Sequence, residues 1–106
     1  MIKVNVLYNA DIISEVKITG HADYADFGKD IVCAAVSSIV TTTINNILTL
    51  DNNAIKYDSK EGKILITQER DNEIANKLLN TMLSMLRQLA TTYPNNIKIG
   101  GLQWIF

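Results

Sequence analysis

The sequence predicts an α+β fold in which two helices pack with antiparallel β hairpins, in the order β-β-α-β-β-α-β. Three observations carry this prediction: apolar and polar residues alternate near the N-terminus, two long segments repeat apolar residues at helical spacing, and turn signals separate paired strand-like segments. The chain has 106 residues, of which 47% are hydrophobic and 20% are charged. This size and composition predict a single domain over residues 1–106 with one modest core.

Two hairpins are expected along the chain. Side chains of one face of the first strand are Ile2, Val4, Val6 and Tyr8, which alternate with the remaining positions. A turn at residues 9–11 leads into a second strand over residues 12–19, which Gly20 ends. The segments 53–59 and 62–68 flank Lys-Glu-Gly and predict the second hairpin.

The two helices and the last strand complete the order. The first helix is expected from about residue 31 to about residue 50, and the second begins after a cap at Asp71 or Asn72 and ends before Pro94. On a helical wheel, the inward side of the first helix carries Val32, Ala35, Val36, Ile39, Ile47 and Leu50. The final strand is expected to be broken or bulged at Gly100 and Gly101.

Charge and composition limit the classes of partner and the compartment. Ten Lys and Arg residues against eleven Asp and Glu residues give a net charge of −1, without a basic block, so direct nucleic-acid binding is not expected. A single Cys forms no internal disulfide, and the N-terminus lacks the pattern of a signal peptide. No apolar run is expected to approach the roughly 18 to 20 residues that span a bilayer. The prediction is a cytoplasmic protein that engages no membrane.

One stretch, residues 20–37, contains the only histidine and the only cysteine of the chain. Cys33 falls in the first turn of the predicted helix, where unpaired N–H groups and the helix dipole favour the reactive thiolate. His21 follows Gly20, and the intervening loop is long enough to bring the imidazole to the thiol as its base. The same two residues also fit a core thiol and an ordinary polar turn residue.

Small polar residues surround Cys33 on the helical wheel. Asp30, Ser37 and Thr41 form a stripe with it, so Asp30 either orients His21 or caps the helix, and the two serine and threonine hydroxyls either line a site or bond back to helix carbonyls. Asp23 and Asp26 are equally well explained as solvated loop charges. A metal site lacks any standard ligand spacing, so neither a metal nor another cofactor is expected.

The spacing of this stretch resembles the signature of the bacterial ribosomal-processing cysteine proteases, the Prp family. The resemblance covers the whole chain and is most specific in "GHA", "GK" and "DIVCAAVS", at Gly20, His21, Ala22, Gly28, Asp30, Ile31, Val32, Cys33, Ala34 and Ser37. It implies a cysteine endopeptidase that removes a short N-terminal extension from a large-subunit ribosomal protein, as ribosome assembly requires. The alternatives are a non-catalytic ribosome-associated binding module and another small thiol hydrolase.

The resemblance also implies roles for individual residues. Cys33 would be the nucleophile and His21 the general base, with Gly20, Asp30 and Ser37 supporting or orienting them. A mobile substrate loop would comprise Ala22, Asp23, Tyr24, Ala25, Asp26, Phe27, Gly28 and Lys29. The partners implied are the ribosomal-protein extension as substrate and a second copy of the chain in a homodimer.

Overall fold

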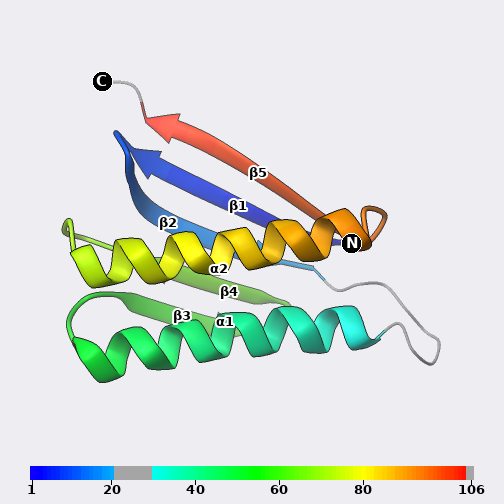
Figure 1. Ribbon diagram of the computed structural model, residues 1–106, viewed down its shortest axis with the longest axis horizontal. Coiled ribbons are helices and arrows are strands. Elements are labelled where there is room, and N and C mark those ends of the chain that lie inside the picture. Colours follow the sequence, from blue (N-terminus) through cyan, green and yellow to red (C-terminus); the bar gives the residue numbers. More distant parts are fainter. Residues whose placement is uncertain (21–29, 105–106) are drawn as a thin grey trace.

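The computed structural model describes residues 1–20 and 30–104, and its elements follow the predicted order (Figure 1). The elements are β1 (Ile2–Asn9), β2 (Ile12–Thr19), α1 (Asp30–Leu50), β3 (Lys56–Lys60), β4 (Lys63–Thr67), α2 (Glu73–Thr92) and β5 (Ile97–Trp104). The α+β prediction is confirmed.

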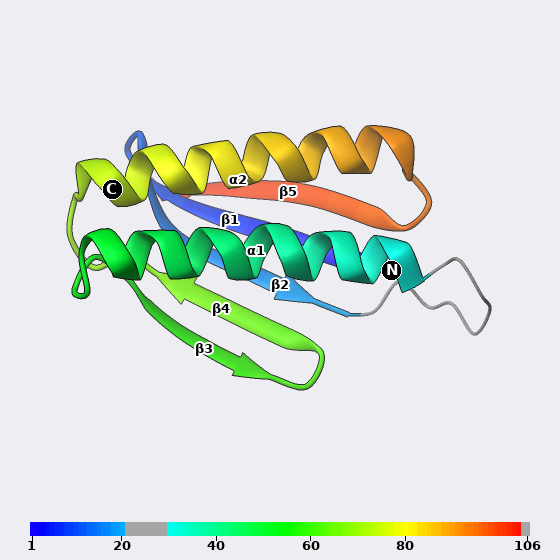
Figure 2. The same ribbon diagram turned by 60° about the horizontal axis from the view of Figure 1, so that its bottom comes forward.

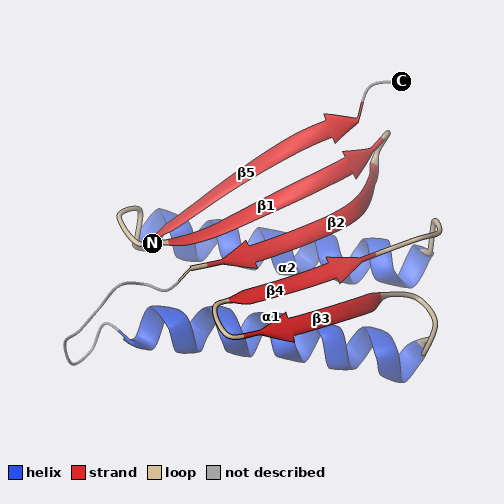
Figure 3. Cartoon of the chain, turned by 180° about the vertical axis from the view of Figure 1, so that it is seen from behind, coloured by secondary structure: helices blue, strands red, loops and turns tan. Residues whose placement is uncertain are grey.

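The strands form one sheet in the order β3-β4-β2-β1-β5, and both helices lie on one face of it (Figure 2, Figure 3). Strands β1 and β2 pair antiparallel, as do β3 and β4, so both predicted hairpins are present. Strand β4 also pairs antiparallel with β2, whereas β5 pairs parallel with β1. The sheet is therefore mixed, a feature that the sequence pattern did not predict.

Strand β5 runs through its two glycines without a break. Gly100 and Gly101 pair in unbroken register with Asn5 and Val6 of β1, so the expected bulge at this position is wrong. A Cβ atom built on Gly101 would lie 3.3 Å from Cε2 of Tyr8, a tight approach. The glycine gives room to the tyrosine ring rather than ending the strand. The register shift of the sheet lies instead between Leu7 and Tyr8, in the pairing of β1 with β2.

Helix α1 supplies one apolar stripe to the core. Its buried side chains are Val32, Val36, Val40, Ile44 and Ile47. Leu50, predicted to point inward, is 64% exposed because it ends the helix where the chain turns away from the sheet.

Helix α1 also corrects the expectation about membrane-length apolar runs. Residues 31–50 have a mean hydropathy of 1.7 and are long and apolar enough to cross a membrane by length and composition. The expectation that no run approaches this length was therefore wrong, because threonine, serine and asparagine take the polar positions and no charge interrupts the helix. The burial of its valine and isoleucine stripe in the core accounts for this hydropathy in the fold.

Helix α2 begins and ends where the sequence predicts. The side chain of Asn72 accepts a hydrogen bond from the N–H of Ala75 at 2.9 Å, which caps the first turn. At the other end the N–H of Tyr93 donates to the carbonyl of Leu89, directly before Pro94. The buried residues of α2 are Ala75, Leu79, Met82, Leu83 and Leu86.

A buried glutamine joins the sheet to the start of α2. Gln68, only 5% exposed, donates from Nε2 to the carbonyl of Ile13 at 2.7 Å and to Oδ1 of Asn76 at 2.8 Å. Its Oε1 accepts from the N–H of Asn72 at 3.0 Å, and the Asn72 amide donates to Asp51 at 2.9 Å. Because both ends of the Gln68 amide are bonded, its burial fixes how β2, α1 and α2 meet at this end of the molecule.

Candidate active site

Cys33 lies in the first turn of α1, at the edge of the helix's apolar stripe. Val32 and Val36 are buried in the core, while Cys33 is half-buried and packs against that core from the side. Backbone N–H groups in the first turn of a helix have no partner within the helix. The structure therefore places the thiol where the helical wheel predicts it, at the boundary between core and polar stripe.

A cavity of about 230 Å³ opens beside Cys33. Four parts of the chain meet there: the start of β1, the end of β2, the first turns of α1 and the tip of the β3–β4 hairpin. The lining residues are Ile2, Ile18, Gly20, Cys33, Val36, Ser37, Ser59, Lys60, Gly62, Lys63 and Ile64. The fold thus brings together Gly20, Cys33 and Ser37, three of the residues singled out from the sequence.

Gly20 occupies a backbone position that only glycine accepts without strain. Its φ is +87°, and a Cβ atom there would collide with the carbonyl oxygen of Met1. Its N–H donates to the carbonyl of Gly62 at 3.0 Å, which ties the end of β2 to the hairpin tip. Gly20 therefore fixes the direction in which the chain leaves the sheet toward position 21.

The remaining predicted site residues have less structural description. Asp30 is the first residue of α1, which places it one turn before Cys33. His21 and the predicted substrate loop, residues 22–29, lie outside the described residues. Within the described ranges, no group of three or more His, Cys, Asp and Glu side chains is arranged to hold a metal ion.

The hairpin tip contributes site residues that the sequence analysis missed. Ser59, Lys60 and Lys63 line the cavity because β4 pairs with β2 in a register that sets Lys63 opposite Thr19, beside Gly20. The sequence signal for the hairpin itself was present in Lys-Glu-Gly. Its position next to Cys33 depends on the pairing of strands distant in the sequence, which no local pattern specifies.

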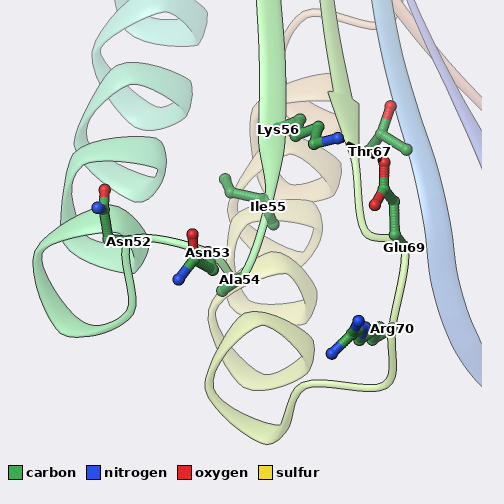
Figure 4. A pocket seen from close by; sticks show the side chains of 8 residues that line it. All are labelled: Asn52, Asn53, Ala54, Ile55, Lys56, Thr67, Glu69 and Arg70. Atoms are coloured by element: carbon green, nitrogen blue, oxygen red, sulfur yellow. Dashed lines mark ion pairs between the residues drawn. The ribbon is translucent and has the colours of Figure 1, made fainter.

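A larger cavity of about 500 Å³ lies at the other end of α1 (Figure 4). Its lining residues are Asn52, Asn53, Ala54, Ile55, Lys56, Thr67, Glu69 and Arg70. Lys56 and Glu69 form an ion pair there at 2.9 Å. These residues include neither a thiol nor an imidazole, so the cavity lacks the groups that nucleophilic catalysis requires.

A two-layer α+β fold with a thiol in the first turn of a helix, facing a cavity beside a strand end, defines the class of small thiol hydrolases. Residues 1–98 match the family described as cysteine protease Prp, and the chain belongs to this family. It is therefore a cysteine protease by class, and the resemblance seen in residues 20–37 is confirmed.

Individual relatives agree with this assignment. The chain is 34% identical over 103 residues to the ribosomal processing cysteine protease Prp of Staphylococcus aureus, covering 93% of this chain and 97% of the relative. Its fold matches a crystal structure of the essential S. aureus protease with a covalently linked product peptide, with a TM-score of 0.88 and 29% identity over 96% of this chain and 100% of the other. A second S. aureus structure, with a substrate peptide, matches with a TM-score of 0.86 and 28% identity over the same shares.

Proposed function

We propose that the protein is the cysteine endopeptidase that removes a short N-terminal extension from a large-subunit ribosomal protein. The observation that carries this proposal is the family match over residues 1–98 together with Cys33 in the first helical turn, beside a cavity. The relatives named as ribosomal processing proteases, one of them with a substrate peptide, support the same substrate class. The family favours this function over a non-catalytic module or a different thiol hydrolase.

The proposed chemistry follows from the residues at the site. The Cys33 thiolate attacks the scissile carbonyl, a C–S bond forms, and the oxyanion is stabilised by N–H groups of the first turn of α1. His21, acting as the acid, protonates the leaving amine as the C–N bond breaks. Water, deprotonated by His21, then hydrolyses the thioester and releases the extension with a new carboxylate.

Three further residues have supporting roles in this proposal. Gly20 directs the chain into His21, because its conformation and its hydrogen bond to Gly62 set the exit from β2. Ser37 lies one turn after Cys33 and lines the same cavity. Asp30 orients His21 or caps α1, and the substrate loop at 22–29 closes over the bound peptide.

The protein is further proposed to act in the cytoplasm as a homodimer. The charge balance and the single Cys support the compartment. Exposed apolar side chains on both helices, including Ile31 at 54% and Met85 at 46% exposure, are surfaces that association would bury.

A cleavage assay tests the proposal. The full chain is incubated with a synthetic peptide spanning the processing site of the ribosomal-protein precursor, and mass spectrometry identifies the products. We expect a single cut by the wild type and none by Cys33→Ala or His21→Ala, because each removes a group that the covalent step needs. Ser38→Ala, an exposed change on α1 outside the Cys33 cavity, serves as the control and should cut normally. An intact peptide with wild type rejects the substrate, and cutting by Cys33→Ala rejects the mechanism.

A further inference from the structure

The cavity at Cys33 continues into a second hollow along α1. This hollow, of about 80 Å³, is lined by Thr41, Ile44, Asn45, Tyr57, Ser59 and Ile64, so it shares Ser59 and Ile64 with the Cys33 cavity. Together the two form one groove between α1 and β3. We call it the α1–β3 groove and define it by Cys33, Ser37, Thr41 and Asn45 on α1, Tyr57 and Ser59 on β3, and Ile64 at its floor.

The groove exists because the helices do not cover the outermost strand. Tyr57 and Ser59 pair with Ile66 and Ile64, whose neighbours in β2 are the buried Val16 and Ile18, so these β3 side chains project from the helix-facing side of the sheet. In a two-layer fold this side is normally buried. Tyr57 is nevertheless 52% exposed, and Figure 2 shows β3 as the strand farthest to one side of α1.

The opposite wall is a row of small uncharged side chains on α1. Cys33, Ser37, Thr41 and Asn45 follow one another at intervals of four residues and therefore lie along one face of the helix. Ser37, Thr41 and Asn45 are all exposed. Their hydroxyl and amide groups are suited to hydrogen bonds with an extended backbone, while Ile64 and the Tyr57 ring offer apolar contact.

We propose that the α1–β3 groove binds the extension itself, that is, the substrate residues before the scissile bond, with Thr41 and Tyr57 as specificity-determining residues. This inference rests on the proposed function and adds to it the place and the chemistry of substrate recognition. From Cys33 to Asn45 the helix rises roughly 18 Å. That length accommodates about five residues of extended peptide.

The direction of the bound peptide follows from the position of the groove. Figure 1 shows that α1 begins at one end of the molecule and runs along its long axis, so the groove leads from Cys33 over the body of the protein. The extension is short and free, whereas the substrate beyond the cut is a folded ribosomal protein that needs open space. The extension therefore lies in the groove, and the remainder of the substrate leaves from the end of the molecule.

The groove also selects the kind of side chain. An extended peptide turns every second side chain to the same side, so alternate residues of the extension face Ile64 and Tyr57 and are apolar. Lys60 and Lys63 line the groove at the Cys33 end. Lysine or arginine in the extension next to the cut is disfavoured there by like charge.

A matched pair of threonines provides the test. Thr41→Arg fills the groove, whereas Thr42→Arg places the same group on the neighbouring exposed residue, which faces the hollow between α1 and α2. Both are made in Cys33→Ala, and binding of a fluorescein-labelled peptide containing the extension is measured by anisotropy. We expect Thr41→Arg to weaken binding at least tenfold and Thr42→Arg to change it less than twofold. Equal affinities for the two variants overturn the proposal.

Cleavage kinetics with the thiol intact separate this inference from the function on which it rests. Thr41→Arg and Tyr57→Ala should raise KM for the full extension with little change in kcat, and Tyr57→Phe should restore the wild-type KM. A peptide with only two residues before the cut should be cleaved equally by Thr41→Arg and Thr42→Arg. Cutting by wild type with no difference between the two arginine variants rejects the groove alone. Peptide binding that depends on Thr41, without any cutting by wild type, rejects the protease function alone.

Discussion

The two ends of α1 border cavities of opposite character. At its C-terminal end lies the larger cavity, about 500 Å³, next to Gln68, Asn72 and Asp51, whose side chains hydrogen-bond one another or the nearby backbone. At its N-terminal end lies a cavity of about 230 Å³ that contains Cys33. The comparison teaches that volume and polarity do not identify the site. The C-terminal end uses its polar groups to hold elements together, whereas the N-terminal end presents a nucleophile to an open groove.

The largest effect on this comparison is expected from Gly20→Ala. The new methyl group collides with Met1 at a residue whose φ is +87°, so we expect a loss of about 2–4 kcal/mol in the free energy of unfolding. Because Gly20 leads into His21 and lines the Cys33 cavity, kcat/KM of the folded protein should also fall. Urea unfolding and peptide cleavage measure the two effects.

Gly100→Ala is the matched control for this change. Its new Cβ would lie 3.5 Å from Oδ1 of Asn5, an ordinary contact, so stability should fall by less than about 1 kcal/mol with activity retained. If Gly20→Ala were as stable and active as Gly100→Ala, the site would not depend on the exit from β2.

A smaller effect, confined to stability, is expected from Gln68→Leu. The change leaves the buried carbonyl of Ile13 and the N–H of Asn72 without the glutamine amide, at a cost of about 1–3 kcal/mol. Gln88→Leu, on an exposed position of α2, should change stability by less than about 0.5 kcal/mol. Cleavage by the folded Gln68→Leu protein should match wild type. A selective loss of activity would show that the C-terminal end of α1 takes part in catalysis.

The smallest effect is expected from Lys56→Gln in the larger cavity. The Lys56–Glu69 pair is exposed, with side-chain exposures of 76% and 60%, so its removal should cost no more than about 1 kcal/mol. KM and kcat for the precursor peptide should stay at wild-type values. A rise in KM would place substrate in the cavity of Figure 4 and contradict the division between the two ends.

Elements with a local signal were predicted closely. The alternation in β1 and the cap at Asn72 depend on neighbouring residues, and the structure has both. Gly100 and Gly101 misled the prediction because a glycine pair usually signals a break, whereas here Gly101 makes room for Tyr8 across the strand pair. The uncharged length of α1 was underestimated because its polar residues, although uncharged, were taken to interrupt the apolar run.

The site divides in the same way. Cys33 was predictable because it is unique, begins a helix and sits in a specific spacing with His21, Gly20 and Asp30. Lys60, Lys63 and Ser59 were not, because they reach Cys33 only through the pairing of β4 with β2. The open face of β3, with Tyr57 beside Thr41, likewise depends on how far α1 extends across the sheet.

By itself the sequence determined the order of elements, the position of the thiol in its helical turn and the family, because these depend on short-range periodicity and on the spacing of a few residues. Only the tertiary structure decided the parallel pairing of β5 with β1, the approach of the hairpin tip to Gly20 and the groove that begins at Cys33. The physical reason is that strand register and helix placement minimise the free energy of the whole core. A contact between residues forty positions apart leaves no periodic trace in the chain.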